Sequence, residues 1–354
     1  MQKIIALAEK VLNGQDITKE EAEFLINVSD DDTMLLLAMA DKIRQKYAGD
    51  AVDCCAIING RSGKCSENCK FCAQSAHYHT GVKEYGLLSE EEIFNAAKKA
   101  KEAGAVRFSI VTSGRGQSKA DDFENICRTL KRIKEELHIE VCASLGILTV
   151  EQAKELRKAG VTRYHSNLET AGSNFPNICS THTYADKFVT IKNAQAAGLR
   201  VGKVCHVEDV QQLKGTLGAV LFLFPVVGQT DQRRGKIVLH GLMQAFTLKE
   251  LGVDSVPLNM LTPIPGTPFE NNKPLPPLEI LRAFAVFRFV LPKAQIRTAG
   301  GREVNLRDLQ ALALNGGASG IMIGGYLTTA GRGTDRDMQM LKDLDRPRSM
   351  PNLD

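Results

Sequence analysis

The chain has no tryptophan and only 6% aromatic residues, and its net charge at pH 7 is a small +4. No block of lysine and arginine with interleaved aromatic residues appears, so we expect no nucleic-acid partner. The longest apolar run, residues 217–228, is too short to span a bilayer. The nine cysteines are odd in number and no secretory signal precedes them, which argues against a disulfide framework. We therefore expect a cytoplasmic protein with reduced thiols.

Three of the cysteines form a compact motif in the run from Gly63 to Ala73. Cys65, Cys69 and Cys72 have the spacing Cys-x3-Cys-x2-Cys, which places three thiolates on one turn. Three thiolates can hold three irons of a [4Fe-4S] cube and leave the fourth iron open. Structural metal sites close their coordination shell, whereas catalytic sites keep one position open. The motif therefore predicts chemistry at the cluster.

Structural zinc is the main alternative for this loop. Zinc knuckles need a second cysteine pair or a Cys/His pair nearby. The nearest histidines, His77 and His79, lack that spacing. We therefore favour the iron–sulfur interpretation.

The remaining sequence predicts an α/β fold, a (β/α)8 TIM-type barrel with an N-terminal helical extension. Residues 1–50 have helical apolar spacing and a capping box, Thr18-x-x-Glu21. Residues 51–330 alternate short apolar segments with amphipathic helices, and 331–354 form a C-terminal tail. A doubly wound open sheet is the alternative. The predicted strands are residues 52–58, 106–112, 139–145, 161–168, 199–204, 255–261, 295–298 and 320–323.

Polar side chains gather where the predicted strands end. In a barrel of this kind the active site lies at the carboxyl ends of the strands. The cysteine loop directly follows the first strand, so the open iron is expected at the barrel mouth. The other polar residues at strand ends are Asn59, residues 113–115, residues 165–169, Asn259 and residues 297–302.

With this loop, the chain resembles the radical S-adenosylmethionine enzymes, and more narrowly the biotin synthase family. The cysteine loop matches that family's motif, including Phe71 and the trailing Ala73-Gln74-Ser75. The resemblance covers residues 1–201 and 246–345. Its further motifs are Ser180-Thr181-His182-Thr183-Tyr184, residues 256–261 with Gly266-Thr267-Pro268, residues 299–303, and Tyr326-Leu327-Thr328-Thr329.

The resemblance implies a radical sulfurtransferase that converts dethiobiotin to biotin. The open iron of the [4Fe-4S] cluster would bind S-adenosylmethionine, and its cleavage would give a 5′-deoxyadenosyl radical that takes hydrogen from two carbons of dethiobiotin. Sulfur would come from an auxiliary cluster, [2Fe-2S] in the family. A flavodoxin or ferredoxin would supply electrons, and a homodimer is common in the family. The cofactors carry out the radical chemistry, while the protein binds and orients the cofactors and the substrate and excludes water.

The auxiliary site departs from the family pattern. Cys142 and Arg297 match two of the family's ligands, but Ser109 stands where a cysteine is usual. A serine oxygen is a harder and weaker iron ligand. Cys55 shares one strand face with Asn59, so it is expected to point into the barrel, deeper than Asn59. Our hypothesis is that Cys55 replaces the cysteine ligand that is missing at Ser109. The alternative is a buried core thiol.

The resemblance also assigns binding residues. Glu169 stands for the usual Asp, and Lys187 stands for an arginine that meets the cofactor carboxylate. Lysine supplies the charge without the bidentate fork. Cys54, Cys127 and Cys179 match no family position and are interpreted as structural. The implied contacts are Asn167 and Glu169 to substrate and cofactor ribose, Asn259 to substrate, Lys187 to the cofactor and Tyr78 to the adenine.

Residues 202–245 depart abruptly from the family, and the segment is longer than the family's. Cys205 is an alternative third auxiliary ligand, although the strict family position falls on Gly202. The fifth strand is either residues 200–205 or the apolar residues 219–224. Three interpretations remain: an active biotin synthase, a different radical enzyme such as a hydrogenase maturase, or an inactive chain that only binds a cluster.

Overall fold

The computed structural model describes residues 1–199, the backbone of residues 221–223, and residues 244–348. Eight parallel strands form one sheet in the order β4-β3-β2-β1-β8-β7-β6-β5. This order confirms the predicted barrel-type fold. The strands are β1 (Asp53–Arg61), β2 (Arg107–Thr112), β3 (Glu140–Ser144), β4 (Val161–Tyr164), β5 (Leu221–Leu223), β6 (Ser255–Met260), β7 (Gln295–Thr298) and β8 (Gly320–Met322).

The sheet closes between its first and last strands. Asp53, Cys54 and Cys55 of β1 pair with Gly320, Ile321 and Met322 of β8. A doubly wound sheet of order 3-2-1-4-5-6 would pair its first strand with the second and the fourth, not with the last, so that alternative is wrong. Within the described residues no pair joins β4 to β5.

The fifth strand lies in the apolar stretch 219–224. β5 pairs in parallel with Leu258, Asn259 and Met260 of β6. The other predicted fifth strand, residues 200–205, lies outside the described residues, and so does Cys205.

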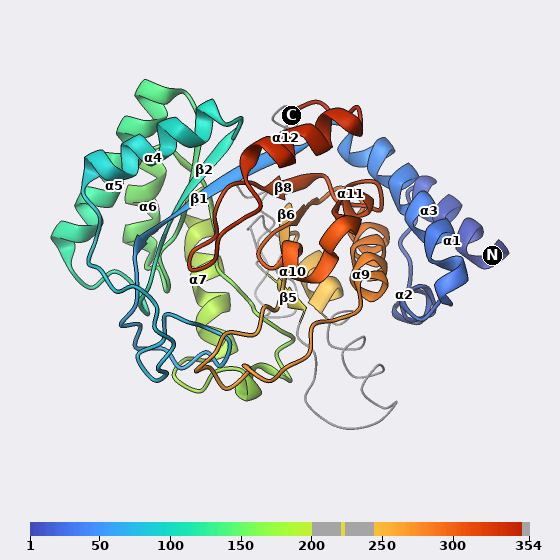
Figure 1. Cartoon of the computed structure of the whole chain (residues 1–354), viewed down its shortest axis with the longest axis horizontal. Coiled ribbons are helices and arrows are strands. Elements are labelled where there is room, and N and C mark those ends of the chain that lie inside the picture. Colours follow the sequence, from blue (N-terminus) through green and yellow to red (C-terminus); the bar gives the residue numbers. More distant parts are fainter. Residues whose placement is uncertain (200–220, 224–243, 349–354) are drawn as a thin grey trace.

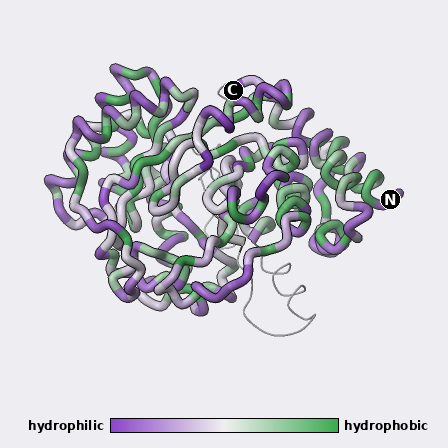
Figure 2. Tube along the Cα trace, viewed as in Figure 1, coloured by the Kyte–Doolittle hydropathy of each residue, from purple (hydrophilic) through white to green (hydrophobic). Residues whose placement is uncertain are grey.

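Helices cover the outside of the sheet, which Figure 1 shows most clearly for α4, α5 and α6. Their buried residues lie on one face, as Ile93, Phe94 and Ala97 do on α4. Figure 2 shows the apolar residues concentrated towards the sheet. None of the helices in the described ranges combines the length and apolarity that a membrane span requires. The helices are α1 (Gln2–Leu12), α2 (Lys19–Ile26), α3 (Asp30–Ala48), α4 (Glu90–Glu102), α5 (Ala120–Leu137), α6 (Val150–Lys158), α7 (Tyr184–Ala196), α9 (Pro277–Val290), α10 (Arg302–Leu306), α11 (Gln310–Leu314) and α12 (Thr334–Asp343), with 3₁₀ turns η1 (Phe175–Asn177) and η2 (Arg307–Leu309).

The first three helices form the predicted N-terminal extension. The capping box at Thr18 is present, because its hydroxyl accepts from the Glu21 N–H and the Glu21 carboxylate accepts from the Thr18 N–H. α2 and α3 pack on α9, which places the extension against the β7 side of the barrel (Figure 1). Arg282 of α9 fixes this contact by donating to Asp30 at 2.7 Å.

A buried ionic cluster lies at the amino end of the barrel interior. The Asp53 carboxylate is fully buried and lies 2.6 Å from Arg297, 3.6 Å from Arg107 and 3.7 Å from Arg163. Burial alone would raise the pKa of Asp53, but the three guanidinium charges hold it well below its ordinary value. The carboxylate therefore stays ionised and ties β1 to β7, β2 and β4.

We expect Asp53→Asn to destabilise the fold by about 3–5 kcal/mol, because it leaves buried guanidinium groups without their counter-charge. Urea unfolding of the purified chain measures this loss. Lys158→Ala is the matched control, since Lys158 is 73% exposed in its ion pair with Glu155. Exposed pairs contribute about 0–1 kcal/mol. An Asp53→Asn protein as stable as this control would contradict the structural role of the cluster.

Candidate active site

The cysteine loop folds back on itself immediately after β1. The Cys65 N–H donates to the Gln74 carbonyl at 2.9 Å, and the Ala76 N–H donates to the Cys65 carbonyl at 2.8 Å. Inside this turn the Cys72 N–H donates to the Cys69 carbonyl at 2.9 Å. The backbone thus holds the three thiols on one tight turn, the arrangement that the spacing predicted.

Asn59 and Gln74 attach this loop to the barrel mouth. Asn59 Nδ2 donates to the Gln74 side-chain oxygen at 3.1 Å and to the Leu327 carbonyl at 3.1 Å. The same Gln74 oxygen accepts from the Gly63 N–H at 3.3 Å. Asn59 therefore has a structural task at the mouth, as expected for a polar residue near the end of β1.

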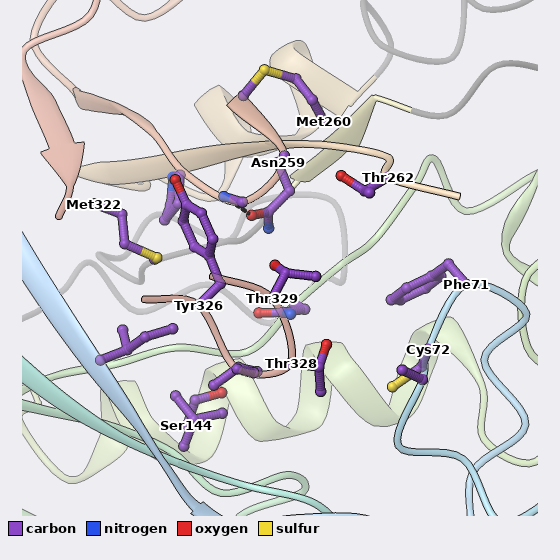
Figure 3. A pocket seen from close by; sticks show the side chains of 18 of the residues that line it. Phe71, Cys72, Ser144, Asn259, Met260, Thr262, Met322, Tyr326, Thr328 and Thr329 are labelled. Carbon is purple, nitrogen blue, oxygen red and sulfur yellow. Dashed lines mark hydrogen bonds between the residues drawn. The ribbon is translucent and has the colours of Figure 1, made fainter. Parts of the chain in front are cut away.

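One cavity runs from the cysteine loop into the barrel. Figure 3 shows Phe71 and Cys72 on one side of it, with Asn259, Met322 and Tyr326 on the other. Deeper side chains from β1, β2 and β7 also line it: Cys55, Ser109 and Arg297. The predicted cluster thiol and three predicted auxiliary-site positions thus face the same space.

The sheet register explains why the auxiliary-site positions meet. Ser109 of β2 pairs with Ile57 on one side and with Cys142 of β3 on the other. Cys55 precedes Ile57 by two residues and lines the same cavity, as the alternation of strand faces predicts. Its neighbour Cys54 instead packs in the hydrophobic core.

The chemistry of this inner site suits an anionic cluster. Arg107 donates to the Cys142 sulfur at 3.6 Å, and Arg297 lines the cavity. The Ser109 hydroxyl and the Arg297 Nε are buried and have no hydrogen-bond partner among the described residues. Burial raises the pKa of Cys55 to about 11, so without a metal this residue is a neutral thiol. Sulfur ligands, unsatisfied polar atoms and nearby guanidinium groups together fit a thiolate-bound iron–sulfur group.

The end of β4 brings polar groups to the mouth. His165 and Asn167 line the cavity. Burial and the charges of Arg163 and Arg297 lower the pKa of His165 well below its ordinary value, so its imidazole is neutral. Glu169 is buried with a left-handed φ of 62°, and burial raises its pKa to about 7. The charge of Lys187 opposes that shift, which places Lys187 and Glu169 in one electrostatic environment.

The raised pKa of Glu169 predicts a pH dependence of stability. The unfolded carboxyl ionises near 4.5 whereas the folded one stays protonated up to about 7. The unfolded state therefore binds fewer protons in this window, and stability falls as pH rises from 4.5 to 7, by up to about 3 kcal/mol. Urea titrations of the cluster-free chain should show this fall, and Glu169→Gln should remove it. An identical pH dependence in both proteins would contradict the assignment.

The structure places the other predicted binding residues as follows. Asn259 lines the cavity, and its Oδ1 accepts from the Gly300 N–H at 2.7 Å, so its amide nitrogen faces the cavity side (Figure 3). Tyr78 lies against the cysteine loop, where its hydroxyl donates to the Asn68 carbonyl at 2.6 Å. Gly301 adopts φ 81°, and a Cβ there would lie 1.9 Å from the Met260 carbonyl, so only glycine suits this turn.

A further group beside the loop was not predicted. Cys179 and His182 lie next to Cys69, and their ligand atoms are within 4.8 Å of one another. The hydrogen bond between the two thiols lowers the pKa of Cys179 to about 3 and raises that of Cys69. The spacing Cys179-x2-His182 was the available signal. Cys179 was predicted to be structural because it matches no family position.

Comparison with known families finds two matching models. The Radical SAM superfamily model matches residues 61–208. The Biotin and Thiamin Synthesis associated domain matches residues 257–346. Both the cysteine loop and the Gly300–Gly301 turn fall within these matches.

The similar proteins include the biotin synthase of Carboxydothermus hydrogenoformans, 47% identical over 97% of this chain and 98% of that protein. The biotin synthase of Desulforudis audaxviator is 45% identical over 96% of each. Among solved structures, methylornithine synthase superposes with a TM-score of 0.77 at 19% identity, covering 98% of both chains. The hydrogenase maturase HydG from C. hydrogenoformans superposes with a TM-score of 0.73 at 17% identity, covering 97% of this chain and 78% of HydG. At these identities the structures show a common fold.

Proposed function

The chain belongs to the biotin synthase family of radical S-adenosylmethionine enzymes. We propose that the cavity between the cysteine loop and the inner strands holds both dethiobiotin and S-adenosylmethionine during sulfur insertion. The observation that carries this proposal is the continuity of the cavity from Cys72 to Cys55, Ser109 and Arg297. A radical formed at one end and a sulfur donor at the other can act on a substrate bound between them.

Two iron–sulfur groups fit the residues at the two ends. Cys65, Cys69 and Cys72 would hold the [4Fe-4S] cluster, and Cys142, Arg297 and Cys55 would hold the auxiliary cluster, with Cys205 outside the described residues. When bound, these groups would supply the electron that cleaves S-adenosylmethionine and the sulfur that enters biotin. The protein's part is to hold their ligands on rigid strands and to exclude water.

The cavity wall between these ends fits dethiobiotin, a cyclic urea with an aliphatic acid chain. Asn167 and Asn259 present amide groups, which can both donate to and accept from a urea. Apolar side chains suited to the aliphatic chain also line the cavity. They are Ile57, Val111, Leu261, Ile264 and Met322.

The cofactor side rests on residues near the cysteine loop. Lys187 would meet the carboxylate of S-adenosylmethionine, Glu169 and Asn167 its ribose, and Tyr78 its adenine. The burial of Glu169 supports a hydrogen-bonding role, since a carboxyl group near its pKa can both donate and accept. We also propose, by resemblance to the family, a flavodoxin- or ferredoxin-type reductant and a homodimer.

Anaerobic reconstitution tests the function. The purified chain is loaded with iron and sulfide and supplied with reductant, dethiobiotin and S-adenosylmethionine. We expect biotin together with 5′-deoxyadenosine. Cofactor cleavage without biotin would favour a different radical enzyme, and neither product in a fully iron-loaded chain would favour an inactive cluster-binding protein.

A further inference from the structure

A second set of metal-ligating side chains lies beside the cysteine loop and has no task in the proposed reaction. Cys179 and His182 come from the segment between η1 and α7, and they approach Cys69 of the loop. The Cys179 sulfur lies 3.3 Å from His182 Nδ1. The Glu67 Oε2 lies 2.5 Å from the same imidazole nitrogen. Two thiols and one imidazole thus converge on one point, and the Glu67 carboxylate lies beside the imidazole.

Hydrogen bonds hold the two segments in this arrangement. The Asn68 Oδ1 accepts from the Ser180 N–H at 2.9 Å, and the Asn68 N–H donates to the Thr181 hydroxyl at 3.1 Å. The Lys70 N–H donates to the Ile178 carbonyl at 3.0 Å. The ligand set is therefore built from fixed backbone positions rather than from mobile surface side chains.

The spacing of these atoms suits one tetrahedral ion. With metal–sulfur bonds of about 2.3 Å and metal–nitrogen bonds of about 2.0–2.1 Å, neighbouring ligand atoms lie roughly 3.3–3.8 Å apart. The measured separations, all within 4.8 Å for Cys69, Cys179 and His182, need only small side-chain rotations to reach these values. Mixed sulfur and imidazole ligands select zinc or ferrous iron over magnesium or calcium.

We propose that Cys69, Cys179 and His182 bind a single Zn²⁺ or Fe²⁺ ion in the full chain when the cluster is absent, which leaves the fourth position of the tetrahedron open. Because Cys69 cannot serve both groups, the single ion and the [4Fe-4S] cluster exclude each other. This exclusion rests on the proposed role of Cys69 in the cluster, whereas the single-ion site itself does not.

Cobalt titration of the cluster-free full chain tests the site, since Co²⁺ bound to thiolates in a tetrahedron gives sulfur-to-metal charge-transfer and intense d–d absorption. The key background is Cys65→Ser with Cys72→Ser, which removes the other two loop thiols. We expect this protein to keep one Co²⁺ with these bands. Adding Cys179→Ser should weaken binding by at least about 100-fold, because even outer-shell partners contribute 10–100-fold to metal affinity.

His182→Gln in the same background provides a second variant, and it should also weaken binding. Circular dichroism shows whether each protein is folded. Loss of the bands in the double-serine background, with unchanged bands in Cys179→Ser alone, would place the ion on the three loop cysteines and overturn the proposal. Unchanged binding in both added variants would overturn it as well.

Iron uptake tests the exclusion separately. Wild-type chain loaded with Zn²⁺ should assemble less iron and sulfide than the metal-free chain, whereas Cys179→Ser should assemble equal amounts with and without Zn²⁺. Equal assembly by the Zn²⁺-loaded wild type would contradict exclusion. Failure of the proposed function would instead appear as absent biotin, with the cobalt results unchanged.

Discussion

Replacing Cys72 by alanine is expected to abolish cleavage of S-adenosylmethionine, because the cluster that would carry out this chemistry loses one of its three proposed protein ligands. Cys72 is the loop cysteine that lines the cavity, so its loss removes a proposed cluster ligand at the end of the cavity where the radical would form. Anaerobic assay of 5′-deoxyadenosine, together with iron counting, measures the effect. The expected iron content falls to that of the auxiliary site alone.

Cys127→Ala is the matched control for this variant. Cys127 lies on α5, on the outside of the sheet, and is only partly buried. It should keep full iron content and cleavage activity. If Cys72→Ala cleaved S-adenosylmethionine as well as this control does, the proposed role of the cysteine loop in cleavage would be wrong.

Replacing Cys55 by alanine is expected to separate the two halves of the reaction. The variant should lose the auxiliary iron and sulfide and form no detectable biotin. It should still cleave S-adenosylmethionine, because Cys55 lies deep in the cavity while the loop cysteines are intact. Iron and sulfide analysis, product assay and spectroscopy of the reconstituted protein measure these effects together.

The neighbouring thiol offers the control that this prediction needs. Cys54 is fully buried in the hydrophobic core on the opposite strand face. Cys54→Ala should lower the stability of the fold by about 1 kcal/mol while the auxiliary cluster remains. A Cys55→Ala protein with full auxiliary iron and sulfide would show that Cys55 is a core thiol after all.

Much of the barrel could be predicted because its signals are local. Alternating apolar segments located seven of the strands, and the period of two separated the inward Cys55 from the core residue Cys54. For the fifth strand the sequence offered two alternatives, residues 200–205 and residues 219–224. Pairing with β6 selects the second, which contains Leu221–Leu223. That choice depends on a partner strand far along the chain, which local periodicity cannot report.

Residues of the candidate site could be predicted where they belong to a recognisable sequence motif. Residues that reach the site only through tertiary contacts were missed. The loop cysteines, Asn167, Asn259 and Arg297 were recognised by position. The approach of Cys179 to Cys69 depends on hydrogen bonds between Asn68 and Thr181, residues separated by 113 positions. No sequence pattern encodes that contact. The buried Asp53 cluster likewise arises only when four strands are brought together.

The source of the sulfur atom tests the central claim most directly, because the proposed mechanism requires an inner site that donates it. The chain is reconstituted with isotopically labelled sulfide, freed of unbound sulfide, and allowed a single turnover with dethiobiotin and S-adenosylmethionine. Mass spectrometry then reads the label in biotin. Our account predicts labelled biotin from the wild type and none from Cys55→Ala. Unlabelled biotin from the wild type would contradict it, because the sulfur would then come from outside the cavity.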